Sequence, residues 1–225
     1  MSSIILLGML SACGNSQNSD KTAAIAKAKP AEAAPMATDI NGKIQNILFF
    51  GTSLTAGYGL DPAEAYPALI QKKIDSLDLP YKVINGGLSG ETSAAGKSRI
   101  DWLLKQPIAV FVLELGANDG LRGLSVTETS ANLQAVIDKV KAKYPNVKMV
   151  MAGMQMPPNM GEKYTADFKA VFSNLAQKNQ MVFVPFLLEG VGGVARLNQE
   201  DGIHPTAEGQ QILAENVWKK LKAEL

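Results

Sequence analysis

Three side chains in this sequence could together transfer an acyl group. Ser53 offers a hydroxyl, His204 is the sole imidazole of the 225-residue chain, and Asp201 stands three residues before that histidine. A serine nucleophile needs a base to accept its proton, and the base needs a carboxylate to fix its tautomer. Ser53, His204 and Asp201 can fill these roles, so the sequence predicts a catalytic triad.

Three groups could stabilise the oxyanion that forms during acyl transfer. Gly90 offers a backbone N–H with no side chain in the way, Asn118 offers a carboxamide, and Ser53 offers its own backbone N–H. Each has a structural alternative, because Ser53 could cap a helix, Gly90 could serve backbone geometry and Asn118 could belong to a turn. Asp201–Pro205 could likewise be a turn that feeds a helix. Their joint occurrence favours an oxyanion hole of Ser53, Gly90 and Asn118.

Short apolar runs alternate with longer helical patterns along the chain, and these predicted strands and helices must position the candidate site residues. The candidate strands cover residues 46–50, 82–85, 109–115, 148–153 and 181–185. The candidate helices cover residues 66–77, 94–104, 126–143, 164–178 and 206–222. This alternation predicts an α/β fold, namely a flavodoxin-like three-layer α/β/α domain with a five-stranded parallel sheet. Because parallel strands end at one edge of a sheet, the segments that follow them should meet there.

The segments that carry these residues resemble the four sequence blocks of the SGNH or GDSL hydrolases, in the order of that family. The blocks are Gly51–Leu54, Ser89–Thr92, Gly116–Asp119 and Asp201–Pro205. The runs Leu113–Gly123 and Pro157–Asn159 are most similar to the branch that contains periplasmic acyl-CoA thioesterases, also described as lysophospholipases and arylesterases. Carried over position by position, the family's functional serine, glycine, asparagine, aspartate and histidine fall on Ser53, Gly90, Asn118, Asp201 and His204.

The resemblance implies a serine esterase or thioesterase that hydrolyses acyl esters and needs no metal or organic cofactor. Its small-molecule substrate would be a lysophospholipid, an acyl thioester or an aryl ester. One alternative is a carbohydrate or peptidoglycan O-deacetylase, which would use the same triad on the same fold. A second alternative is a non-catalytic envelope binding lipoprotein, whose function would survive the loss of Ser53.

Thr52 departs from the family pattern, which has an aspartate before the serine. That aspartate helps to hold the loop in the family, so we expect the threonine to affect stability or rate and not the class of reaction. The Gly-x-Ser-x-Gly elbow of α/β-hydrolases is absent, because a threonine occupies the position of its second glycine. Among nearby charged residues, Glu114 and Asp119 are interpreted as structural. Lys97 and Arg99 are interpreted as part of a solvated helix face.

A loop rich in methionine and proline follows the fourth candidate strand, at the expected active edge. Met154, Met156 and Pro157 lie on this loop. Methionine side chains are flexible and adapt to apolar ligands, so these residues could line an acyl groove. The alternative is that they fill the core or the loop.

Residues 1–43 predict an export signal and a linker. The apolar run Ile4–Leu10 is far shorter than the roughly 20 residues of a membrane-spanning helix and is typical of a signal peptide. Leu10–Cys13 resembles a bacterial lipobox, so we expect a lipoprotein signal peptide over residues 1–12 and lipid attachment at Cys13. No lysine or arginine precedes the apolar run, which leaves a plain secretory signal as the alternative. Residues 13–43 lack large apolar side chains and predict a disordered tether before a hydrolase domain over residues 44–225.

Composition narrows the remaining possibilities. The chain has 22 lysines and arginines against 21 aspartates and glutamates, so no long-range field favours nucleic acid. One cysteine excludes an intramolecular disulfide and a cysteine-rich zinc site. The length and the 46% of hydrophobic residues suit one core, and we expect a monomer. We place it in the bacterial cell envelope, on the periplasmic side, with its lipid anchor in a membrane.

Overall fold

A parallel sheet of five strands forms the middle layer of the structure, a computed structural model that describes residues 44–225. The strands are β1 (Gln45–Gly51), β2 (Tyr81–Gly87), β3 (Val110–Glu114), β4 (Lys148–Ala152) and β5 (Val182–Val184). Their order across the sheet is β2-β1-β3-β4-β5, and every neighbouring pair is parallel. This is the strand order of flavodoxin-like domains. The predicted fold class is therefore confirmed.

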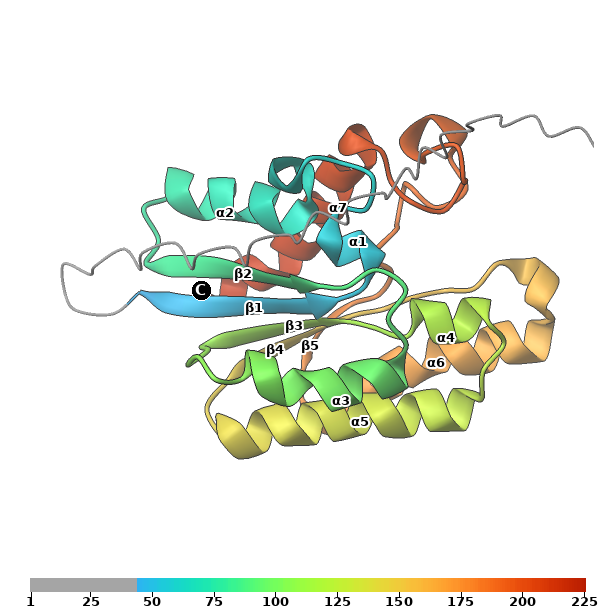
Figure 1. Ribbon diagram of the computed structural model, residues 1–225, viewed down its shortest axis with the longest axis horizontal. Helices are drawn as coiled ribbons and strands as arrows, with labels where there is room; N and C mark the ends of the chain where they lie inside the picture. The colour runs from blue at the N-terminus through green and yellow to red at the C-terminus, as the bar shows by residue number, and fades with distance from the viewer. Residues whose placement is uncertain (1–43) are drawn as a thin grey trace, which may run out of the picture. The chain divides into compact units, whose positions relative to one another are not determined.

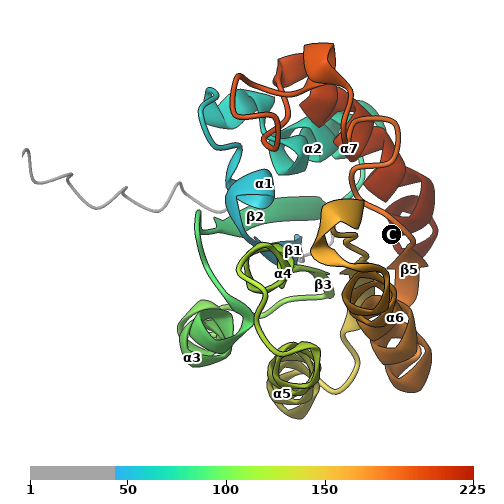
Figure 2. The same ribbon diagram turned by 90° about the vertical axis from the view of Figure 1, so that its right-hand side faces the viewer.

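Five long helices cover the two faces of the sheet (Figures 1 and 2). They are α2 (Tyr66–Ser76), α3 (Ser93–Leu103), α5 (Val126–Lys143), α6 (Glu162–Asn179) and α7 (Ala207–Leu221). Helices α2 and α7 pack together on one face, and α3, α5 and α6 pack on the other. The sequence predicted all five, with ends that agree to within two residues. None of the helices described is long and apolar enough to cross a bilayer.

The core lies on both faces of the central strands. Every residue of β3 is buried, and so are Ile47–Gly51 of β1. Such uninterrupted burial is typical of parallel strands that carry helices on both sides. Helix α5 contributes Leu133, Val136, Ile137 and Val140, which recur at helical spacing and are fully buried. The apolar stripe of this helix therefore belongs to the core.

Two short helices that the sequence did not predict begin directly after β1 and β3. They are α1 (Ser53–Ala56) and α4 (Ala117–Leu121), and each carries one of the predicted site residues in its first turn. The strand that leads into α1 must end in glycine, because a Cβ on Gly51 would collide with Thr55 Oγ1 and Glu114 Oε2. Short 3-10 turns occur at Pro62–Glu64, Pro158–Met160, Ala195–Leu197 and Lys222–Glu224.

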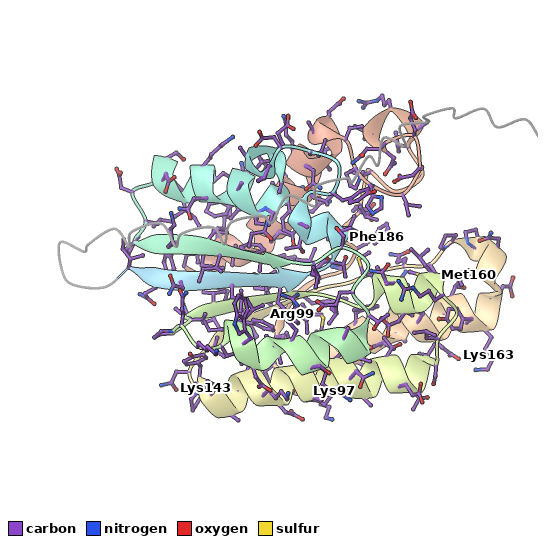
Figure 3. The ribbon with its side chains drawn as sticks, in the orientation of Figure 1. Lys97, Arg99, Lys143, Met160, Lys163 and Phe186 are labelled. Carbon is purple, nitrogen blue, oxygen red and sulfur yellow. The ribbon has the colours of Figure 1, made fainter. Side chains whose placement is uncertain are left out.

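The interpretation of Lys97 and Arg99 as a solvated helix face is wrong. The guanidinium of Arg99 donates to both carboxylate oxygens of the buried Glu91 at 2.6 Å and lies 4.6 Å from the centre of the Phe50 ring. The ammonium of Lys97 donates to Asn132 Oδ1 at 2.6 Å. Lys97 and Arg99 are labelled in Figure 3. A guanidinium and a carboxylate pair strongly when both N–H groups engage, and this pairing turns Arg99 inward.

The predictions for the N-terminal segment lie outside the described residues. They are the signal peptide over residues 1–12, the lipid attachment at Cys13 and the tether over residues 13–43.

Candidate active site

The predicted site segments meet at the edge of the sheet where the strands end. Ser53 follows β1, Gly90 follows β2, and Asn118 follows β3. Strand β1 lies between β2 and β3 in the sheet. The chain therefore passes from β1 to its neighbour β2 on one side, and then crosses to β3 on the other side of β1. Ligands of open α/β sheets bind at such a switch point. Asp201 and His204 reach the same edge from the loop before α7.

Ser53, His204 and Asp201 form a continuous chain of hydrogen bonds. Ser53 Oγ and His204 Nε2 are 2.9 Å apart, and His204 Nδ1 and Asp201 Oδ2 are 2.6 Å apart. With the Nδ1 proton donated to Asp201, Nε2 is the acceptor for the Ser53 hydroxyl. The structure therefore brings the three predicted residues together in the geometry that a serine nucleophile needs.

The carboxylate of Asp201 is held by its own loop. Its Oδ1 accepts the backbone N–H groups of Ile203 and His204, each at 3.0 Å. The hydrogen bond from the His204 side chain, followed by these two backbone bonds, lowers the pKa of Asp201 to about 2. Asp201 is therefore ionised at neutral pH and can stabilise a positive imidazolium.

Gln199 joins the loop that carries His204 to the segment that follows Ser53. Its backbone N–H donates to the His204 carbonyl at 2.7 Å, and its side-chain amide donates to the Tyr58 carbonyl at 2.7 Å. The ring of Tyr58 lies against the imidazole, with 4.6 Å between the ring centres. These contacts fix the orientation of His204. The sequence analysis missed both Tyr58 and Gln199, although each lies within five residues of a site residue.

The three predicted oxyanion groups line one cavity with His204. The N–H of Ser53 lies in the first turn of α1, and Gly90 has a φ of 78°, which favours glycine. Asn118 Nδ2 donates one of its two hydrogens to the Glu91 carbonyl at 3.0 Å, and this bond fixes the plane of the amide. Among residues 44–225, neither the Ser53 nor the Gly90 N–H donates a hydrogen bond. These backbone groups are available for a ligand.

A buried carboxyl supports the turn that carries Ser53. Glu114 accepts hydrogen bonds from the Thr52 N–H at 2.8 Å, the Thr52 hydroxyl at 3.0 Å and the Thr55 hydroxyl at 2.7 Å. Its side chain is completely buried, and this burial raises the pKa of Glu114 to about 7 despite the three donors. Thr52 thus anchors the turn that carries Ser53, where the family pattern has aspartate. These contacts agree with a structural role for Glu114.

Asp119 has a similar supporting position behind Asn118. Its carboxylate accepts from the backbone N–H of Ser93 at 2.7 Å, the Ser93 hydroxyl at 2.5 Å and the Thr129 hydroxyl at 3.3 Å. The side chain is 2% exposed, so it points into the protein and away from any ligand. The carboxylate joins the start of α3 to α4 and α5, as expected for a structural residue.

The cavity that opens on Ser53 has a volume of about 550 Å³. Met154, Met156 and Pro157, for which the sequence left open an acyl groove or a filling role, lie in its wall, and Met154 is also part of the buried core. Apolar residues from other segments complete the wall: Leu54, Tyr58, Leu121, Phe186, Leu188 and Ile203. Phe186 is labelled in Figure 3 near the end of β1. The sequence analysis missed these six, although Ile203 lies between Asp201 and His204 and Leu121 lies three residues after Asn118.

No group of three or more histidine, cysteine, aspartate or glutamate residues gathers anywhere in residues 44–225 in an arrangement that could hold a metal ion. The polar groups of the cavity include the hydroxyl, imidazole, amide and backbone N–H groups described above, and the side chains of Ser89, Gln155 and Asn198 also line it. They are suited to attack on a carbonyl and to stabilisation of the oxyanion that results.

Comparison with known proteins places this arrangement among ester hydrolases. Residues 49–212 match the model of the GDSL-like Lipase/Acylhydrolase family. The chain is 41% identical to the esterase TesA of Pseudomonas aeruginosa over 179 residues, which cover 79% of this chain and 88% of that protein. It is 36% identical to thioesterase 1/protease 1/lysophospholipase L1 of Escherichia coli K12 over 177 residues, or 78% of this chain and 83% of that protein. A crystal structure of TesA superposes with a TM-score of 0.77 and covers 80% of this chain and all of that one.

Proposed function

The chain belongs to the GDSL-like lipase/acylhydrolase family and is an ester-hydrolysing enzyme, and from this premise we propose that Ser53, His204 and Asp201 are its catalytic triad. The observation that carries the proposal is the 2.9 Å contact between Ser53 Oγ and His204 Nε2 at the floor of a largely apolar cavity. The substrate is an acyl ester or thioester whose acyl chain occupies that cavity.

The reaction proceeds in two steps. His204 Nε2 accepts the Ser53 proton as Ser53 Oγ attacks the carbonyl carbon, and Asp201 stabilises the resulting imidazolium. The oxyanion accepts hydrogen bonds from the Ser53 and Gly90 N–H groups and from Asn118 Nδ2. The tetrahedral intermediate collapses, His204 returns the proton to the leaving alkoxide or thiolate, and an acyl-enzyme remains. A water molecule then gives a proton to His204 and attacks the acyl carbon. The second tetrahedral intermediate collapses as His204 returns that proton to Ser53 Oγ, which releases the acid and restores the serine hydroxyl.

The apolar wall favours an acyl chain over a sugar as the group that is bound. Met154, Met156 and Leu188 offer methylene and thioether surface, and a carbohydrate needs hydrogen-bond partners that such a surface lacks. The relatives carry the names esterase, thioesterase, lysophospholipase and arylesterase, which agree with this choice. Lysophospholipids, acyl thioesters and aryl esters are therefore the substrate classes to test first.

The test is hydrolysis of p-nitrophenyl esters from acetate to palmitate, together with an acyl-CoA, a lysophosphatidylcholine and an acetylated sugar. The variants are Ser53→Ala and His204→Ala, and Ser98→Ala on the exposed surface of α3 is the matched control. Loss of activity in the first two alone, with an optimum beyond acetate, supports an acyl esterase. Preference for the acetylated sugar would indicate a deacetylase, and full activity of folded Ser53→Ala would contradict the triad.

For location, we propose a lipid anchor at Cys13 on the periplasmic side of the bacterial envelope. The proposal depends on the lipobox-like Leu10-Ser11-Ala12-Cys13. Metabolic labelling with radioactive palmitate in a bacterial host tests it. Wild type should be labelled and Cys13→Ser should not, and a label that persists in Cys13→Ser would contradict the anchor. We further propose that the enzyme is a monomer.

A further inference from the structure

Exposed lysines gather at the end of the domain where the strands begin, opposite the active site. We call this the lysine end and define it by Lys82, Lys105, Lys143 and Lys148, all of which are exposed. Lys82 lies at the start of β2 and Lys148 at the start of β4, whereas Lys105 follows α3 and Lys143 ends α5. In Figure 3, Lys143 lies at one end of the molecule, and Phe186 and Met160 lie toward the other.

Two neighbouring hollows bring these lysines together. Lys105, Lys139 and Lys143 line a hollow of about 430 Å³ between α3 and α5. Lys143 and Lys148 line a second hollow of about 370 Å³, together with Gln45 and Tyr81. Because Lys143 belongs to both, the two hollows adjoin. They form one indented, positively charged surface.

In the part of the chain that the structure describes, most of the lysines at this end are not paired with a carboxylate. Asp101 pairs with Lys139 at 2.6 Å, and the Lys148 ammonium donates to the Glu224 backbone carbonyl. Within residues 44–225, Lys82, Lys105 and Lys143 make no hydrogen bond or ion pair through their ammonium groups. The other acidic groups on adjoining loops are Asp78, Glu224 and the C-terminal carboxylate of Leu225.

The usual reason for lysine at a helix end explains only part of this pattern. Cations near a helix C-terminus complement its dipole, and this accounts for Lys143 in the last turn of α5. Lys82 and Lys148 begin strands, where no such dipole exists. Their position therefore calls for a different explanation.

Large apolar side chains are exposed at the same end. Trp102 lies in the last turn of α3, three residues before Lys105, and is 66% exposed. Leu77 follows α2 and is 58% exposed. Tryptophan beside lysine is typical of surfaces that meet a membrane interface, where the ring lies at the level of the headgroups and the ammonium groups meet phosphates.

The charge at the active-site end is different. Exposed acidic residues there include Asp61, Glu128, Glu162, Glu189, Glu200 and Asp201, beside cations such as Arg122, Lys163 and Arg196. An anionic surface would attract the lysine end and would have no such attraction to the mouth of the cavity. Residue 44 also enters β1 at the lysine end, so the 43 residues before it join the domain on this side.

We propose that the lysine end is a docking surface for an anionic phospholipid bilayer. Lipid phosphates occupy the two hollows beside Lys105, Lys143 and Lys148, and Trp102 enters the headgroup layer. The docked domain presents the Ser53 cavity away from that bilayer. This inference concerns the surface alone and does not depend on the reaction.

The test is sedimentation of the full chain with vesicles of phosphatidylcholine alone or mixed with phosphatidylglycerol at roughly 2:1. Every protein in the test carries Cys13→Ser, so that no lipid anchor contributes to binding. The variant Lys105→Glu/Lys143→Glu changes the lysine end. The matched control Lys163→Glu/Lys169→Glu makes the same change in net charge on the exposed surface of α6. Hydrolysis of a p-nitrophenyl ester, which should be equal in all three proteins, shows that each is folded.

We expect wild type and the control to bind the anionic vesicles, and the lysine-end variant to lose at least about tenfold in partition coefficient. Salt at about 1 M should weaken binding of wild type in the same way. Equal loss in both variants, or no loss in either, would overturn the proposal. A different result would also overturn it. If wild type did not bind vesicles but formed dimers in analytical ultracentrifugation, and the lysine-end variant were a monomer, the surface would join two copies of the chain.

Discussion

The backbone N–H of Thr52 donates to Glu114 Oε2 at 2.8 Å, which fixes the residue before the nucleophile to a completely buried carboxyl. The Thr52 hydroxyl donates to the same carboxyl. A threonine at this position therefore lets one buried carboxyl serve as acceptor for the whole turn. An aspartate in its place would bring a second carboxylate against Glu114, and two carboxylates in one site cannot both ionise easily.

Glu114 should make the stability of the protein depend on pH. Burial raises its pKa from 4.5 to about 7, so the folded state holds the proton more tightly than the unfolded state does. The stability that this adds is fully present below pH 4.5 and is lost as the pH rises through 7. In urea titrations, the unfolding free energy of wild type minus that of Glu114→Gln should fall by up to about 3 kcal/mol from acid to pH ~8. The control is the exposed Glu128→Gln, for which the difference in unfolding free energy from wild type should not fall with pH. If the difference for Glu114→Gln were also constant with pH, Glu114 would not be a buried carboxyl that titrates in this range.

Asp201→Asn should lower kcat by roughly 10⁴-fold while the fold is retained, because an amide no longer fixes the productive tautomer of His204. Hydrogen bonds from His204 and Ile203 lower the pKa of Asp201 to about 2. The pH profile of kcat/KM should therefore show no inflection from this carboxylate above about pH 3. Asp138→Asn, on the exposed face of α5, is the control for the loss of one carboxylate. A variant Asp201→Asn within tenfold of wild type would exclude Asp201 from the triad.

Asn118→Ala should reduce kcat by about 10²- to 10³-fold with a smaller change in KM, because its amide acts on the oxyanion more than on the bound ester. Asn132→Ala is the matched control, since Asn132 also loses a side-chain hydrogen bond but lies away from the cavity. The measurement is steady-state kinetics on one p-nitrophenyl ester. A loss confined to KM would show that Asn118 only binds substrate, or holds the Glu91 carbonyl, and would remove it from the oxyanion hole.

Met156 should help to set the length of the acyl chain. It lines the cavity and packs so closely on Gly120 that a Cβ there would collide with its sulfur. Met156→Ala should move the optimum of kcat/KM toward longer p-nitrophenyl esters, and Met156→Trp toward shorter ones, by roughly tenfold between extremes. Met160→Ala, outside the cavity wall, should leave the profile unchanged. Identical profiles for all variants would mean that the acyl chain lies elsewhere.

The fold could be predicted because its signals are local and repeated. Buried runs such as Ile47–Phe50 and the apolar stripe of α5 define strands and helices without knowledge of their partners. The short helices α1 and α4 escaped prediction for the same reason, since four or five residues do not complete enough turns to show a period. The turn of α1 depends on hydrogen bonds to Glu114, which is distant in sequence, and α4 begins after Gly116.

The proposed catalytic residues were predictable because each stands in a motif next to an element end. Their supports were not, because the partners are distant in sequence. Gln199 reaches the Tyr58 carbonyl across 141 residues, and Thr52 meets Glu114 across 62. Arg99 lies only eight residues from Glu91, yet helical periodicity could not reveal that the carboxylate is buried. The spacing of residues in the sequence indicated the candidate reactive groups, whereas the residues that support them could be identified only from tertiary contacts.

His204 can be observed directly by NMR, because the chain has no other histidine. It is the one histidine of the chain, and it is hydrogen-bonded to Asp201 on one ring nitrogen and to Ser53 on the other. Every imidazole resonance in a proton or nitrogen NMR spectrum must therefore come from the proposed general base. The protonation of that base, and its response to an inhibitor bound at Ser53, can be followed in the wild-type sequence without residue assignment or substitutions.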